Sequence, residues 1–117
     1  MAIAFDLVTL DAPEPRRLAD FWAALLDLAV TEDEDDGRWI VLSTRSGGRR
    51  LGIQRGDVRP GSVHLDLSCG RHDLQAEVRR AVGLGATLVA PLRHEPYGSI
   101  ANLVDPDGNV FDLCAYD

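Results

Sequence analysis

The chain of 117 residues contains no lysine, and its 12 basic residues are all arginine. This absence excludes lysine Schiff-base chemistry by the protein's own side chains. The 19 acidic residues bring the formal net charge to −7. Binding to nucleic-acid phosphates needs a basic stripe, so a nucleic acid is not expected as a partner.

Cysteine is scarce, because only Cys69 and Cys114 occur and they lie far apart in the sequence. The first residues show no basic segment followed by an apolar stretch, so we expect neither an export signal nor a disulfide framework. No apolar run approaches the length of a membrane span. These absences predict a cytoplasmic protein that does not use a membrane as a partner.

Several local signatures of catalysis are missing as well. The sequence has no Gly-rich phosphate loop, no Gly-x-Ser-x-Gly elbow and no Cys-x-x-Cys knuckle. What is present is ordinary globular composition, with 45% hydrophobic and 26% charged residues. The length predicts a single domain over residues 1–117.

The apolar pattern predicts one order of elements twice, strand, helix and then three strands. In the first unit, about residues 1–56, a helix follows the first strand, and the strands are expected at 3–10, 28–31, 38–44 and 50–55. In the second unit, residues 62–117, the helix is expected at 73–84, and the strands at 62–69, 86–92, 99–104 and 110–116. A linker with Pro60 and Gly61 separates the units. Such an internal repeat predicts two similar sheets.

Two local features of the first unit allow alternatives. Its helix could begin with Asp11 as N-cap, or with Pro15 at the first helical position. The acidic run at 32–36 could be a cation site or a solvated loop. Five consecutive acids do not have the alternating spacing of a calcium loop, so we favour the solvated loop.

The end of the chain combines a turn with an unusual strand. Asp-Pro-Asp-Gly-Asn at 105–109 has turn chemistry at every position, and apolar runs flank it on both sides. This pattern predicts a β-hairpin. Alternation in the last strand places Phe111 and Leu113 on one face and Asp112 on the other. An acid on one face of a well-paired strand is the first indication of a site.

This hairpin, with Val-Phe-Asp-Leu at 110–113, resembles the closing hairpin of the vicinal oxygen chelate superfamily. That superfamily includes glyoxalase I, extradiol dioxygenases, fosfomycin-resistance thiol transferases and bleomycin-resistance proteins. The segments at 10–15, 18–22, 63–67 and 84–86 agree with the resemblance. It implies an α+β fold in which two βαβββ units form a curved mixed sheet of eight strands, with helices on the convex side. It also implies a homodimer.

The resemblance implies four inward-facing metal positions, which fall here on Leu7, Gln54, His64 and Asp112. Leu7 cannot bind a metal, and Asp112 is one methylene shorter than the usual Glu. The first expectation is therefore that no cofactor is bound. The alternative is a divalent ion (Ni, Zn, Mn or Fe) held by His64, Gln54 and Asp112.

The same resemblance places other side chains in the concave face. Trp39, Gln54, Tyr97 and Ser99 are expected to contact a ligand there, and the segment 94–98 is expected to form a loop over the pocket mouth. His64 and Asp112 are expected to act as a general base with an orienting carboxylate. The plain alternatives are a satisfied strand histidine, a turn-bonding acid and ordinary packing of the aromatic residues.

Three functions fit these observations. The chain could be a small-molecule enzyme of the lyase or isomerase type, with His64 and Asp112 as catalytic residues. It could be a non-catalytic binder, similar to the drug-sequestering resistance proteins, with no metal. It could also be a regulatory module that has lost its site. Leu7 favours the second and third, and the presence of His64 and Asp112 favours the first.

Overall fold

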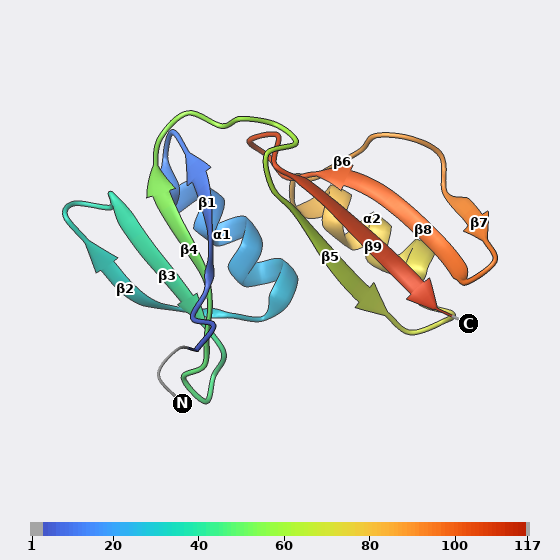
Figure 1. The fold of residues 1–117 in the computed structure, drawn as a ribbon, viewed down its shortest axis with the longest axis horizontal. Coiled ribbons are helices and arrows are strands. Elements are labelled where there is room, and N and C mark those ends of the chain that lie inside the picture. Colours follow the sequence, from blue (N-terminus) through green and yellow to red (C-terminus); the bar gives the residue numbers. More distant parts are fainter. Residues whose placement is uncertain (1–3, 117) are drawn as a thin grey trace. The chain divides into compact units, whose positions relative to one another are not determined.

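The computed structural model describes residues 4–116. The chain divides into two compact units, Met1–Val58 and Arg59–Asp117 (Figure 1). Each unit has an α+β arrangement, in which one main helix packs against a mixed sheet.

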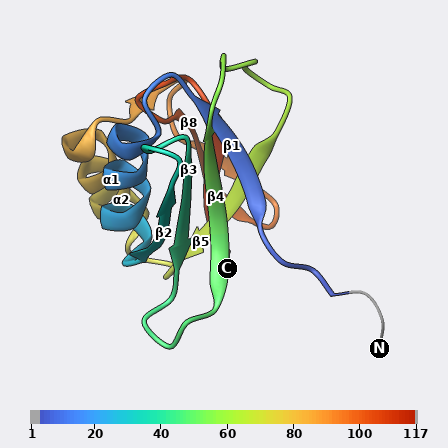
Figure 2. The ribbon, with the colours of Figure 1, turned by 90° about the vertical axis from the view of Figure 1, so that its left-hand side faces the viewer.

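The first unit has a four-stranded sheet in the order β1-β4-β3-β2. Strands β1 and β4 are parallel, and the other neighbours are antiparallel. Its elements are β1 (Val8–Ala12), α1 (Pro15–Leu26), β2 (Ala29–Glu34), β3 (Trp39–Ser43) and β4 (Arg49–Arg55). Figure 2 shows α1 along one face of these strands.

Helix α1 begins at Pro15, which occupies its first turn, and Glu14 is the N-cap residue. The alternative that used Asp11 as N-cap is wrong, because Asp11 lies inside β1. Leu18 and Trp22 are fully buried on the apolar stripe of the helix. The stripe predicted from the apolar spacing is thus confirmed, and it covers the sheet face that carries Ile53.

The acidic run differs from the predicted loop. Strand β2 continues to Glu34. Of the five acids, only Asp35 and Asp36 therefore lie in the turn, where their φ angles are 53° and 55°. Arginines pair with several of these acids, as in the ion pair between Asp33 Oδ2 and Arg16 Nε at 2.8 Å. Pairing with β3 and with the arginines extends the strand beyond the point that its local sequence predicts.

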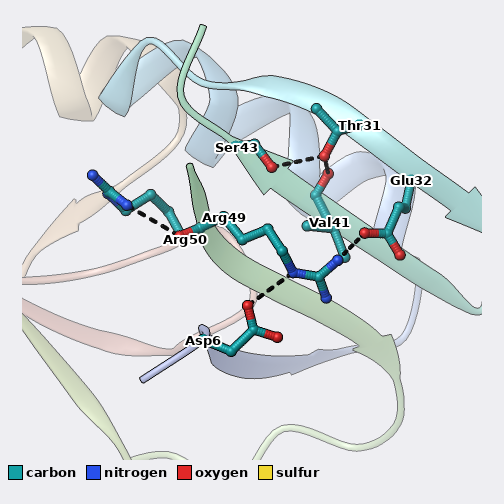
Figure 3. A network of polar contacts seen from close by, with 7 residues as sticks. All are labelled: Asp6, Thr31, Glu32, Val41, Ser43, Arg49 and Arg50. Atoms are coloured by element: carbon teal, nitrogen blue, oxygen red, sulfur yellow. Dashed lines mark hydrogen bonds and ion pairs between the residues drawn. The ribbon is translucent and has the colours of Figure 1, made fainter. Parts of the chain in front are cut away.

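A polar network joins residues of β2, β3 and β4 with Asp6, which precedes β1 (Figure 3). The guanidinium group of Arg49 lies between two carboxylates: its Nε is 3.0 Å from Asp6 Oδ1, and its Nη1 pairs with Glu32. Nearby, the hydroxyls of Thr31 and Ser43 are hydrogen bonded at 2.7 Å. The pairing register shifts near these residues, between Val30 and Glu32 in β2 and between Leu42 and Ser43 in β3.

The second unit has a five-stranded sheet in the order β5-β9-β8-β6, and β7 also pairs with β8. Strands β5 and β9 are parallel, whereas β8 is antiparallel to β9, β6 and β7. Its elements are β5 (His64–Cys69), α2 (Leu74–Leu84), β6 (Thr87–Leu88), β7 (Arg93–Glu95), β8 (Gly98–Val104) and β9 (Val110–Tyr116).

Two expectations for this unit are wrong. The strand predicted at 86–92 is only the two residues of β6, because Pro91 cannot donate to a ladder and interrupts the run. The loop predicted at 94–98 instead contributes to a short hairpin, in which β7 pairs with the start of β8. Within residues 4–116 the structure has nine strands, one more than the eight implied by the family resemblance.

The predicted turn at 105–109 is confirmed. The carboxylate of Asp105, which is 2% exposed, accepts hydrogen bonds from the backbone N–H groups of Asp107 and Asn109 and from Asn109 Nδ2, each at 2.9 Å. Gly108 has a φ of 94°, as this turn requires. Separately, none of the helices described in residues 4–116 is long and apolar enough to cross a membrane.

Candidate functional site

The sheet of the second unit has one face covered by α2 and one polar face. Phe111 and Leu103 are fully buried, and they point to the side of α2. Alternation places Asp66, Asp112 and Asn102 on the opposite side. We call that side the polar face, and the same alternation adds to it His64, Ser68, Gly98, Ile100, Val104, Val110, Cys114 and Tyr116.

A row of polar side chains crosses three strands of the polar face. Asp66 of β5 is the register partner of Asp112 of β9, which is in turn the partner of Asn102 of β8. Asn102 Nδ2 donates a hydrogen bond to Asp112 Oδ1 at 2.7 Å. His64 begins β5, and its Nε2 lies 3.6 Å from Asp66 Oδ2. One potential ligand atom from each of His64, Asp66 and Asp112 lies within 4.8 Å of the others.

An aromatic pair lies further along β9, at the end of that strand. The rings of Tyr116, on β9, and Tyr97, in the β7–β8 turn, have centroids 6.0 Å apart. The hydrogen bond with Cys114 is the largest influence that raises the pKa of the Tyr116 phenol, and the charge of Asp66 adds to it. The phenol is therefore neutral near pH 7, and it offers the polar face an aromatic surface with a hydroxyl group.

The predicted site residues of the second unit separate into two groups. His64 and Asp112 lie together on the polar face, and Tyr97 contacts Tyr116. Ser99, in contrast, lies on the helix side, where its hydroxyl is 2.7 Å from His94 Nδ1. These two residues help to line a cavity of about 280 Å³, together with Arg71, His72, Leu74, Gln75 and Leu92.

The remaining predicted residues belong to the first unit. The side-chain amide of Gln54 donates to Asp11 Oδ1 at 2.8 Å. The ring of Trp39 lies over Gly52, where no side chain intervenes. Leu7 comes just before β1 and offers no ligand atom. Asp6, its acidic neighbour, is paired with Arg49.

The donor set on the polar face fits a divalent ion. One imidazole and two carboxylates suit Mn²⁺, Fe²⁺, Ni²⁺ and Zn²⁺. The predicted set of His64, Gln54 and Asp112 omitted Asp66, although the spacing His64-Leu65-Asp66 already places both polar side chains on one strand face. The missing information was the in-register pairing of β5 with β9, which brings Asp66 beside Asp112.

Comparisons with known proteins agree with this fold. Residues 7–114 match the family described as glyoxalase-like domain. The chain is 35% identical over 99 residues to the anthracycline biosynthesis protein DnrV of Streptomyces peucetius, and the match covers 80% of this chain and 34% of DnrV. The chain thus spans about a third of the length of that relative.

Two solved structures illustrate the likeness. A variant of the fosfomycin resistance protein FosX from Listeria monocytogenes, complexed with Mn(II), has a TM-score of 0.80 at 16% identity, and covers 100% of this chain and 93% of its own. The antibiotic binding protein TnmS3 from Streptomyces sp. CB03234 has a TM-score of 0.68 at 23% identity, over 100% and 99%. From the family match, the chain belongs to the glyoxalase-like domain family.

Proposed function

We propose that this chain binds a small organic molecule of the natural-product type on the polar face of its second unit. The observation that carries the proposal is the row of His64, Asp66, Asp112 and Asn102, with the tyrosine pair further along β9. Small-molecule sites combine a few placed polar groups with apolar and aromatic surface. The row supplies the polar groups, and Tyr97 and Tyr116 supply exposed aromatic rings.

The relatives support a polycyclic aromatic ligand. DnrV is an anthracycline biosynthesis protein, and TnmS3 is an antibiotic binding protein. A planar ring system can stack on a tyrosine while its oxygens and hydroxyls bond to amide and carboxylate groups. Asn102 and Asp112 are register partners, and Tyr116 lies about 13 Å further along β9, which suits an extended ring system.

Acid-base catalysis on the bound molecule is a second candidate, with lyase or isomerase chemistry. The supporting observation is the imidazole of His64, which has the carboxylate of Asp66 at 3.6 Å and that of Asp112 in the same cluster. A carboxylate beside an imidazole can orient the ring for proton transfer to or from a bound molecule. We expected Asp112 in this role, and the geometry favours Asp66 as the nearer acid.

A titration with doxorubicin, an anthracycline, tests the binding proposal by the quenching of its fluorescence. We expect saturable binding, weakened roughly tenfold by Tyr116→Ala or Asn102→Ala, which is about 1.4 kcal/mol. Ser99→Ala, on the helix side, is the matched control and should bind as the wild type does. Failure to saturate, or an equal loss in the Ser99→Ala variant, would argue against the polar face as the site.

The catalytic candidate is tested in the same samples. Chromatography of the ligand after incubation shows whether it is converted. If the chain is an enzyme, His64→Ala should abolish conversion and leave most of the binding. Unchanged ligand in the wild-type sample would favour a binding protein for this compound.

The family likeness also supports a homodimer. Light scattering coupled to size exclusion would then give twice the mass of one chain, with and without ligand. A monomer mass at micromolar concentration would speak against this part of the proposal.

A further inference from the structure

We infer that the cavity beside the start of α2 and the β7–β8 hairpin binds an oxyanion, the phosphate or carboxylate group of a small molecule. Arg71, His94 and Ser99 are the side chains that hold it. The cavity lies on the helix side of the sheet, so it is separate from the polar face. The inference does not depend on the proposed function, because the anion can be titrated without an aromatic ligand.

A tight turn presents two basic side chains to the cavity. The backbone N–H of Asp73 donates to the carbonyl oxygen of Gly70 at 2.9 Å, so Arg71 and His72 are the central residues of the turn. Both are exposed and both line the cavity. Helix α2 begins directly afterwards with Leu74, which is buried and adds an apolar part to the lining. The turn thus places a guanidinium group beside an apolar wall.

The β7–β8 hairpin contributes a hydrogen-bonded pair to the lining. His94 of β7 and Ser99 of β8 are register partners, so their side chains lie on the same face of the hairpin. Ser99 Oγ lies 2.7 Å from His94 Nδ1. A neutral imidazole has one N–H and the hydroxyl has one O–H, and the bond between them uses only one of these. Whichever group donates, the pair keeps a donor for a ligand oxygen.

Arg71 forms no ion pair with any acid of residues 4–116. Within that range seven arginines do form ion pairs with acids, and they are Arg16, Arg17, Arg38, Arg45, Arg49, Arg80 and Arg93. The positive charge of Arg71 is thus available to a ligand, although acids outnumber arginines in the chain.

The rest of the lining also favours an anion. Among the described residues that line the cavity, none is acidic. The nearest acid in sequence, Asp73, is the N-cap residue of α2 and does not belong to this lining. In a chain with a net charge of −7, most surfaces repel an anion, so a hollow with only basic, neutral polar and apolar side chains is a favoured place for one.

A cavity of the first unit gives a useful contrast. Its volume is about 320 Å³, and Arg16 and Arg17 line it together with Glu14. Arg17 Nη1 lies 2.6 Å from Glu14 Oε2, and Arg16 Nε lies 2.8 Å from Asp33 Oδ2. Acids of the protein already balance these two arginines, so we do not expect an anion there.

The size and the donors of the second unit's cavity define the class of ligand. Its volume of about 280 Å³ is just below the range of about 300–1,000 Å³ that is typical of sites for drug-sized molecules. The planar guanidinium group of Arg71 can bind two oxygens of a phosphate or a carboxylate side by side. The pair of His94 and Ser99 can donate to a further oxygen. We therefore expect a compact phosphate or carboxylate compound.

The test follows backbone amide chemical shifts of the full chain while sodium phosphate is added at constant pH and ionic strength. A second titration uses sodium acetate. We expect changes at Arg71, Gln75, His94 and Ser99 that saturate together with at least one of the two anions. Saturation with phosphate alone assigns the site to phosphate compounds, and saturation with acetate alone assigns it to carboxylates.

Three variants locate the anion. Arg71→Gln should weaken binding by roughly tenfold or more, because a hydrogen bond to a charged group is lost. Ser99→Ala should weaken it by about fivefold, as expected for one neutral hydrogen bond. Arg79→Gln is the matched control, since it removes the same charge from an exposed position of α2 outside the lining, and it should bind as the wild type does. The amide spectra also show whether each variant is folded.

Two results would overturn the inference. One is the absence of saturable changes with both anions, or wild-type affinity in Arg71→Gln. The other is an equal loss in Arg71→Gln and Arg79→Gln, which would reduce the effect to the overall charge of the chain. Doxorubicin binding should be unchanged in Arg71→Gln, so the anion site and the proposed function can fail independently.

Discussion

Gly52 has no space for a side chain above the sheet of the first unit. A Cβ built there would lie 2.3 Å from Cη2 of Trp39. We expect Gly52→Ala to lower the free energy of unfolding by about 1–3 kcal/mol, because the indole ring must move. Gly83→Ala is the control: it is in helix α2, a Cβ there meets nothing within 4 Å, and we expect a gain of about 0.4–1 kcal/mol. Urea denaturation measures both, and equal effects would contradict this account of Trp39.

The buried carboxylate of Asp105 stabilises the turn at 105–109. Asp105→Ala removes the acceptor of three hydrogen bonds from Asp107 and Asn109. Because this carboxylate is almost fully buried, we expect a loss of about 2–4 kcal/mol in the free energy of unfolding. Asp57→Ala, at an exposed position, should change it by less than about 0.5 kcal/mol. Similar values for the two variants would show that the turn does not depend on this carboxylate.

Cys69 is predicted to be a slow nucleophile. Burial raises the pKa of its thiol, and the charges of Asp73 and Glu77 raise it further. The reactive thiolate is thus scarcer at pH 8 than in an ordinary thiol, and it accumulates only as the pH rises further. In a Cys114→Ala background, the rate with a disulfide reagent at pH 8 should be several-fold below that of glutathione, and urea should restore it. A rate equal to that of glutathione in the native protein would contradict the shift.

The β7–β8 hairpin depends on the close approach of Gly98 to β9. Its φ is 144°, and a Cβ there would lie 2.2 Å from the carbonyl oxygen of Ala115. We expect Gly98→Ala to lower the free energy of unfolding by about 1–3 kcal/mol and to displace Tyr97 from Tyr116. Tyrosine fluorescence and urea denaturation follow the two effects. Unchanged doxorubicin binding in this variant would indicate that the ligand does not need Tyr97.

Local sequence predicted the elements better than their ends. The stripe of α1 and the turn at 105–109 follow from patterns within a few residues, and both are confirmed. The extension of β2 to Glu34 was not predicted, because it depends on pairing with β3 and on distant arginines. The hairpin of β7 was missed for a similar reason, since its ladder forms with β8 after a turn of mixed composition.

The molecule as a whole was predictable at the level of the fold. The repeated order of elements and the closing hairpin indicated the glyoxalase-like family, which the comparisons show. The candidate site was predictable only in part. His64 and Asp112 follow from the motif, whereas Asp66 becomes part of the site through the register of two strands that lie far apart in sequence. Ser99, which we expected to contact a ligand, lies on the helix side in register with Ala115.

The most direct test of the central claim is a map of backbone amide chemical shifts during a doxorubicin titration. We predict changes that follow the polar face, at His64, Asp66, Asn102, Asp112 and Tyr116, and that saturate together. Changes confined to the cavity near His94 and Ser99, or none at all, would contradict the claim that the polar face of the second unit is the ligand site.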